Sequence, residues 1–109
     1  MSNTVVEGWT DGELVIARQA FDHAYERAVD QLLRTVQVRS AALDSADTLW
    51  ALHDFLSIER HTMEGRFDFR LDGILFVFAS LVKDGLLSIQ ELEGLTPDKL
   101  AKVSAMARF

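Results

Sequence analysis

Cysteine is absent from the sequence, and proline occurs once among its 109 residues. The lack of cysteine excludes a disulfide framework, thiol catalysis and cysteine-ligated zinc. Basic residues are outnumbered, with 11 Lys and Arg against 17 Asp and Glu, and the net charge of −6 argues against a nucleic-acid-binding protein. A chain of this length predicts a single domain.

Long hydrophobic runs are also missing. No apolar stretch approaches the ~20 residues that a membrane-spanning helix needs. The first residues, Met-Ser-Asn-Thr, have neither the basic start nor the apolar core of a signal peptide. We therefore expect a cytoplasmic protein without a membrane span.

Glycine and proline are confined to the two ends of the sequence. Neither occurs between Gly12 and Gly65, which favours helices over tightly turned strands. Thr10 and Glu13 form a capping-box pattern, and apolar residues at spacings of three and four then predict a helix to about Ala42. The members of this apolar stripe are Leu14, Ala17, Phe21, Ala24, Tyr25, Ala28, Leu32 and Val36.

Three further elements follow this helix. Cap-forming residues predict a second helix over 46–64 that ends at Gly65 in a left-handed conformation. The most apolar run of the chain predicts a third helix over 71–83. Capping patterns at 88–91 and 96–97 predict a short turn and then a last helix.

The first helix is too long for a compact monomer. A helix of about 30 residues spans ~45 Å. A compact chain of this size has a radius of gyration of ~13 Å and is only ~34 Å across. One end of the helix would project with its apolar stripe exposed, and a two-fold homodimer is the simplest arrangement that covers it.

The segment 50–61 concentrates the residues that could carry chemistry. On one helix, His53 and His61 would lie ~12 Å apart along the axis, so they cannot hold one metal ion together. The consecutive residues His53 and Asp54 point about 100° apart, which disfavours a catalytic triad with Ser57. A hydrolase or metal-dependent enzyme that uses His53, Asp54 and His61 is therefore the weakest of three alternatives.

The other two alternatives are structural packing and a binding face. In the first, Trp50 and His53 are partly buried and Arg60 pairs with Glu64. In the second, the segment forms an exposed binding or dimer face, because Trp and Arg are enriched among interface hot spots. The residue types alone support both equally.

A long motif spans the predicted second helix and continues beyond it. It reads Leu49-Trp50-x-Leu52-His53-Asp54-Phe55-Leu56-Ser57-x-x-Arg60-His61, then Gly65, Asp68, Arg70, Ile74-x-Phe76-Val77-Phe78-Ala79 and Glu91-Leu92. Upstream residues that match are Trp9, Phe21, Ala24, Tyr25, Arg27, Asp30, Leu32-Leu33 and Thr35-Val36-Gln37. In this pattern the chain resembles the fluorescence recovery protein family over nearly its whole length. Phe67 stands where that family often has Tyr, and Phe69 where a polar residue is common.

The resemblance implies an all-α fold, with a long antiparallel helical dimer and a small helical head formed by the C-terminal half. It implies one domain over 1–109. Within it, 1–9 would be flexible, 10–64 would form the long dimerisation region and 66–109 would form the head.

The resemblance also implies a non-enzymatic regulator that needs neither a metal nor a cofactor. Members of the family bind the C-terminal domain of photoactivated orange carotenoid protein and accelerate its red-to-orange reversion, which ends non-photochemical quenching. Such a protein is cytoplasmic, and thylakoid-associated if the host is a cyanobacterium. The alternative is a related helical dimeric adaptor with a different protein client, in a bacterium that lacks this photoreceptor.

The site residues follow from the same resemblance. Trp50, Asp54 and Arg60 match positions at the dimer interface, and these three together with His53 match a partner-binding patch. Phe76 and Lys102 match partner-binding positions of the head. Phe76 lies in the most apolar run, so a core position is equally consistent with the sequence.

Overall fold

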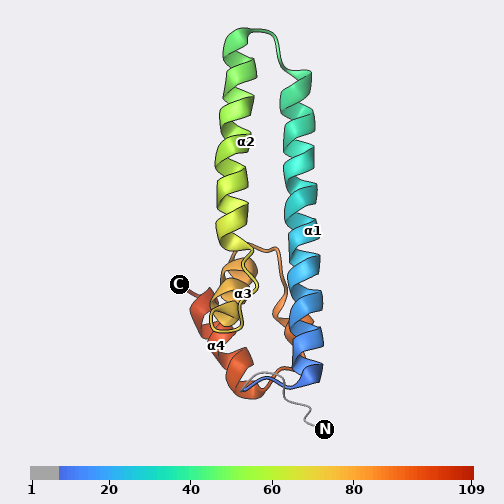
Figure 1. Cartoon of the computed structure of the whole chain (residues 1–109), viewed down its shortest axis with the longest axis vertical. Helices are drawn as coiled ribbons and strands as arrows, with labels where there is room; N and C mark the ends of the chain where they lie inside the picture. Colours follow the sequence, from blue (N-terminus) through green and yellow to red (C-terminus); the bar gives the residue numbers. More distant parts are fainter. Residues whose placement is uncertain (1–7) are drawn as a thin grey trace.

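A computed structural model describes residues 8–109 of the chain as an all-helical hairpin with a small head (Figure 1). Two long helices, α1 (Asp11–Ala41) and α2 (Ala46–Arg66), run antiparallel along the longest axis. The shorter α3 (Ile74–Lys83), η1 (Ile89–Leu92) and α4 (Pro97–Ala107) gather at the base of the hairpin. The predicted all-α fold class is confirmed, and no helix of the described residues is long and apolar enough to cross a membrane.

Capping residues set the starts of the two long helices. The Thr10 hydroxyl accepts a hydrogen bond from the Glu13 amide at 3.1 Å, and the Glu13 carboxylate accepts one from the Thr10 amide, so the predicted capping box is confirmed. Ser45 caps α2 by accepting from the Thr48 amide at 3.2 Å. These bonds satisfy amides that have no partner within the helix.

The predicted end of α2 at Gly65 is wrong. The helix continues to Arg66, and Gly65 is not among the glycines with positive φ. The reason is tertiary packing. The Arg66 guanidinium donates to the Ser80 carbonyl oxygen at 3.0 Å and also bonds Asp84, while Phe67 packs edge-on against Phe21. These contacts outweigh the tendency of a glycine to end a helix.

The third helix begins later than its apolar run suggests. The prediction of a start at residue 71 is wrong, because 71–73 form a turn and Gly73 is the N-cap of α3. The predicted end at residue 83 is confirmed. Gly85 adopts φ +75°, and the Leu86 amide donates to the Leu81 carbonyl at 2.9 Å, which is the pattern of a glycine-terminated helix.

The hydrophobic core lies entirely at the base. Within α1 the buried residues stop at Ala28, and α2 has none. The head supplies most of the fully buried side chains, which are Ile74, Phe78, Leu81, Leu92 and Val103. The outer part of the hairpin therefore has no core of its own in one chain.

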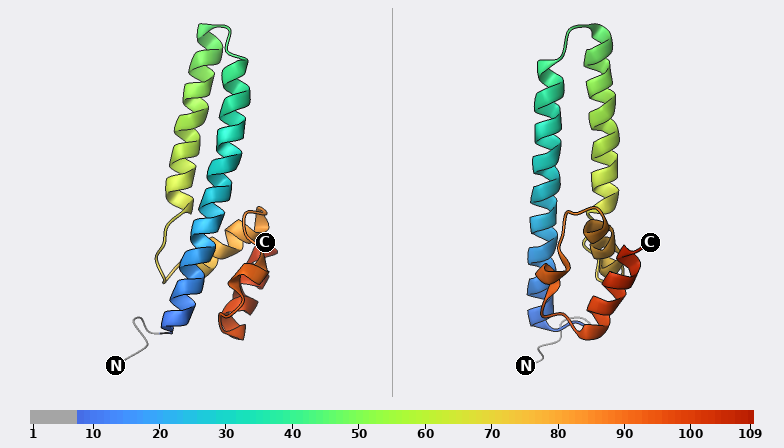
Figure 2. Two further views of the ribbon diagram at one scale, coloured as in Figure 1. Left: turned by 90° about the vertical axis from the view of Figure 1, so that its right-hand side faces the viewer. Right: turned by 180° about the vertical axis from the view of Figure 1, so that it is seen from behind.

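The molecule is also long and thin. Its principal extents are 60 × 30 × 17 Å and its radius of gyration is 17.3 Å, against ~13 Å for a compact chain of this length. The views in Figure 2 show the hairpin as a single layer of two helices. A layer of helices needs a second layer to bury its apolar side, and over the outer half of the hairpin one chain provides none.

Trp9, two residues before α1, is held more firmly than the sequence indicates. Residues 1–7 of the segment 1–9, which the sequence predicts to be flexible, lie outside the described residues. For Trp9 the prediction is corrected, because its ring is buried and the Lys99 ammonium lies 4.2 Å from its centre. A cation over an aromatic face is an attractive contact that the sequence pattern does not reveal.

An ion pair fastens η1 to the hairpin. Arg27 donates to both carboxylate oxygens of Glu91, at 2.8 and 2.6 Å, and to the carbonyl oxygen of Leu86 at 3.0 Å. The bond from Arg27 lowers the pKa of Glu91, against the opposing effect of burial. A paired and planar contact of this kind is stronger than a single surface ion pair.

We expect Arg27→Ala to lower the free energy of unfolding by about 1–2 kcal/mol, because it leaves Glu91 without its charged partner. The loss is no larger because the Arg27 side chain is half-exposed, and water screens the ion pair. Urea unfolding followed by circular dichroism measures the loss. Arg34→Ala, an exposed position on the same helix, is the matched control. Equal stability of the two variants would contradict the assignment.

Candidate protein-interaction site

Three predicted site residues meet on the outer half of α2. Trp50 is 60 % exposed, and its ring packs edge-on against His53 with ring centres 5.8 Å apart. His53 Nδ1 lies 3.2 Å from Asp54 Oδ1. We call these three residues the hairpin patch. The partial burial of Trp50 and His53 expected under the packing alternative does not occur, since both are exposed.

The contact between His53 and Asp54 corrects one sequence argument. Consecutive helical residues point apart at Cβ, but the His53 ring swings toward the carboxylate. Both side chains remain mostly exposed to water. A hydrogen-bonded, exposed imidazole–carboxylate pair is suited to polar contacts with another protein.

Arg60 is not part of this patch. It lies ten residues along α2 from Trp50, or ~15 Å. Its Nε is 3.8 Å from Glu64 Oε2, so the predicted i, i+4 pair is confirmed. Arg60 instead borders a groove between the two long helices.

This hairpin groove has a volume of about 670 Å³. Its lining consists of Tyr25, Val29, Leu32, Leu56, Arg60, Met63, Glu64 and Phe67. The opposite side of the hairpin has a smaller hollow of about 220 Å³, which is lined by polar and apolar side chains in equal number. The polar residues there are Gln31, Thr35, Glu59, Thr62 and Arg66. The hairpin groove has the more apolar lining of the two, because Arg60 and Glu64 are its only charged residues and the others are apolar or aromatic.

The head has a groove of its own between α3 and α4. Phe76 is 70 % exposed at this place, although its neighbour Phe78 is fully buried. The head groove has a volume of about 280 Å³ and is lined by Phe76, Ala79, Ser80, Lys83, Met106 and Phe109. Phe76 is thus a surface residue, and the core position left open by the sequence is excluded.

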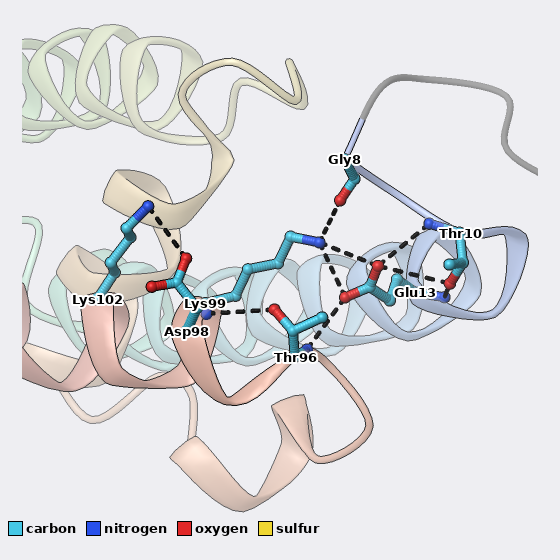
Figure 3. Close-up of polar contacts among 7 residues, drawn as sticks. All are labelled: Gly8, Thr10, Glu13, Thr96, Asp98, Lys99 and Lys102. Carbon is cyan, nitrogen blue, oxygen red and sulfur yellow. Dashed lines mark hydrogen bonds and ion pairs between the residues drawn. The ribbon is translucent and has the colours of Figure 1, made fainter.

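Lys102 lies on α4, the helix that contributes Met106 to the lining of the head groove. It is one helical turn before Met106, which places both on one side of α4. Its ammonium is 3.3 Å from Asp98, and both side chains are exposed (Figure 3). Such a surface pair is weak, so Lys102 can exchange Asp98 for another carboxylate at little cost.

Candidate metal ligands do not cluster in the described residues. Within residues 8–109, no three His, Cys, Asp or Glu side chains gather closely enough to hold a metal ion. His61 is exposed on α2.

Comparison with known proteins assigns the chain. The family model described as photoprotection regulator fluorescence recovery protein matches residues 9–107. The chain belongs to the fluorescence recovery protein family. The curated fluorescence recovery protein of Synechocystis sp. is 44 % identical over 109 residues, which cover all of both chains.

Solved structures of fluorescence recovery proteins are also similar to this chain. Those from Fremyella diplosiphon and Synechocystis sp. PCC 6803 each give a TM-score of 0.89. Their identities to this chain are 39 % and 44 %, and each comparison covers 93 % of this chain and 99 % of the other. Membership of the fluorescence recovery protein family makes this chain a photoprotection regulator, with no catalytic activity indicated.

The sequence does not predict a further cluster of side chains at the base. Glu13 is 5 % exposed and is the buried charged residue of the described chain. Its carboxylate lies 2.9 Å from Lys99 Nζ through both oxygens and also accepts from the Thr96 amide at 3.1 Å (Figure 3). We call Trp9, Glu13, Thr96 and Lys99 the base cluster. The sequence predicts Glu13 only as part of a capping box, because its other partners lie more than 80 positions away along the chain.

Burial tends to raise the pKa of Glu13, but the bonds from Lys99 and from the amides of Thr10 and Thr96 outweigh it, so the pKa is lowered below its ordinary value. A carboxylate with a lowered pKa in the folded chain stabilises the fold above its unfolded pKa. That contribution is lost as the pH falls through the lowered, folded pKa. The base of the molecule is therefore sensitive to acid and insensitive to alkali through this group.

Proposed function

We propose that this chain binds the C-terminal domain of photoactivated orange carotenoid protein and accelerates its red-to-orange reversion, thereby ending non-photochemical quenching. The observation that carries the proposal is the 44 % identity to a fluorescence recovery protein over the full length of both chains. Such a regulator works in the cytoplasm, at the thylakoid surface in a cyanobacterium.

The chemistry of the exposed residues supports a mechanism in which binding alone, without a covalent step, accelerates the reversion. A protein speeds a conformational change when it binds the transition state more tightly than the starting state. The hairpin patch and the head groove offer exposed aromatic rings, a carboxylate and ammonium groups for this purpose. Trp and other aromatic residues supply much of the binding energy at protein interfaces.

We also propose that the chain acts as a homodimer through the hairpin groove. The supporting observations are the absence of any buried residue in α2 and the apolar lining of one side of the hairpin. A second copy placed there would add a second layer of two helices and cover Val29, Leu56 and Met63. Arg60 borders this groove, whereas Trp50 and Asp54 lie farther out on α2.

The test is the rate of red-to-orange relaxation of purified orange carotenoid protein with and without this chain. We expect an acceleration that increases with chain concentration and then saturates. No acceleration at excess chain would overturn the proposed activity and favour a different protein client, in a host without this photoreceptor.

Trp50→Ala should raise the chain concentration that gives half-maximal acceleration by about tenfold, because a hot-spot aromatic contributes more than 1 kcal/mol. The fold should be unaffected, since Trp50 is exposed. Ile58→Ala is the matched control, as an exposed apolar residue on the same helix. Light scattering on both variants separates an effect on partner binding from an effect on dimerisation.

A further inference from the structure

The base cluster joins the start of α1 to the start of α4. Glu13 lies in the first turn of α1, and Lys99 lies in the first turn of α4. The Glu13 carboxylate accepts hydrogen bonds from the amides of Thr10 and Thr96, which are the N-caps of these two helices. One side chain thus satisfies both helix starts.

Lys99 completes the connection. Its side chain is 12 % exposed, and its ammonium donates to both Glu13 oxygens and to the carbonyl oxygen of Gly8. The same ammonium lies over the ring of Trp9. An ammonium group has three donors, and these partners use all of them. The buried pair is therefore fully satisfied, which is the condition under which buried charges are tolerated.

The remaining contacts of α4 explain why this cluster matters. The helix packs chiefly against α3 and η1, and these short elements form the head together with it. Its connection to α1 at this end comes through the base cluster and through the loop at Gly94, which lies against Ile16. A Cβ at Gly94 would come within 2.4 Å of the Ile16 Cδ1 atom.

We propose that Glu13 and Lys99 form a latch that fixes the orientation of α4 relative to α1, in addition to the Arg27–Glu91 and Arg66–Asp84 contacts that fasten η1 and the end of α3 to the hairpin. Lys102 lies one turn beyond Lys99 on α4 (Figure 3), and the head groove is formed partly by the same helix. The latch therefore sets where the head groove and Lys102 stand relative to the hairpin patch. Glu13 and Lys99 are positioning residues and need not touch the partner.

The consequence for partner binding rests on the proposed function. A partner that contacts both the hairpin patch and the head binds tightly only when the two have the correct relative placement. If the head samples other orientations, the apparent affinity falls by the fraction of chains in the competent one. The maximal acceleration at saturating concentration is retained, because bound chains are all in the competent orientation.

The orientation can be measured directly, because the chain has no cysteine. Spin labels on Gln19→Cys and Ala105→Cys, both exposed, report the distance between α1 and α4 by double electron–electron resonance. Dilution into excess unlabelled chain makes distances within one protomer dominate. We expect a narrow distance distribution in the otherwise unchanged chain and a broad one in Lys99→Ala.

Lys99→Ala leaves the buried Glu13 carboxylate without its charged partner, so it also lowers stability. The double variant Glu13→Gln/Lys99→Ala removes both charges and decides the case if the single variant fails to fold. It should be helical and should still give the broad distribution. Asp98→Asn, which breaks an exposed ion pair one residue from Lys99, should leave the distribution narrow.

A narrow, unchanged distribution in the folded double variant would overturn the latch. In the reversion assay, the double variant should need about tenfold more chain for half-maximal acceleration and reach the same maximum, as expected if the competent orientation falls to about a tenth. An unchanged half-maximal concentration with a broadened distribution would overturn the role in binding. If the unmodified chain gave no acceleration, the proposed function would fail, while the label distances would still test the latch.

Discussion

Leu56→Glu is expected to convert the protein from a dimer to a monomer. Leu56 lines the hairpin groove and is already partly exposed in one chain, so a carboxylate there costs the isolated fold little. In the proposed dimer the same carboxylate would be buried in the apolar groove, where the nearest cation, Arg60, already pairs with Glu64, and burying a charge in this way costs several kcal/mol.

Two-fold symmetry doubles the effect. Each protomer contributes one substituted residue to the interface, because the same surface is used by both copies. A cost of about 2 kcal/mol per protomer raises the dimer dissociation constant about 1,000-fold. Arg60→Glu, one turn farther along the same side, should act in the same direction.

Thr62→Glu is the matched control for this prediction. Thr62 belongs to the same helix but lines the smaller hollow on the opposite side of the hairpin. Sedimentation velocity over a range of concentrations measures the dissociation constants. If Thr62→Glu dissociates the dimer and Leu56→Glu does not, the dimer uses the opposite side of the hairpin.

The helices could be predicted from the sequence because their determinants are local. The capping box at Thr10, the glycine at 85 and the proline at 97 each act within a few residues, and all three mark helix ends in the structure. The end of α2 could not be predicted in this way. It depends on contacts of Arg66 and Phe67 with residues distant in sequence.

The apolar surface of α1 could likewise be predicted only in part. The spacing of apolar residues predicts a stripe on α1, but it does not say where the core stops. Ala28 is buried, while Leu32 and Val36 on the same stripe are only half-buried. The head ends near Ala28, and within residues 8–109 only α2 lies beside the later residues of the stripe. The spacing of apolar residues does not distinguish a residue buried by its own chain from one that would be buried only by a second copy.

Long-range polar contacts are the least predictable class. Glu13 reads as an ordinary cap, and Lys99 as one of three lysines in the last third of the chain. Their burial follows only from the path of the chain around the head. The same holds for Phe67, whose ring packs edge-on against both Phe21 and Tyr25 and so fills an apolar position where the family often has a Tyr.

Phe76→Glu is expected to remove most of the acceleration without changing the dimer. Phe76 is 70 % exposed, so the favourable free energy of burying its ring is not gained within one chain. An exposed aromatic beside an apolar groove is typical of an interface hot spot, for which truncation costs 2 kcal/mol or more. A carboxylate in its place should raise the half-maximal concentration about 30-fold or more.

Two further variants show whether this effect belongs to the head groove. Phe109→Ala removes the other exposed ring of the groove and should weaken binding in the same direction. Val15→Glu places the same charge on an exposed apolar position of α1, outside the groove, and should leave the reversion rate unchanged. If Phe76→Glu lowered the rate only in proportion to a loss of helical content, Phe76 would be a structural residue. A selective loss of affinity in a folded dimer would instead place the partner on the head, and its dependence on Lys99 would then connect partner binding to the latch at the base.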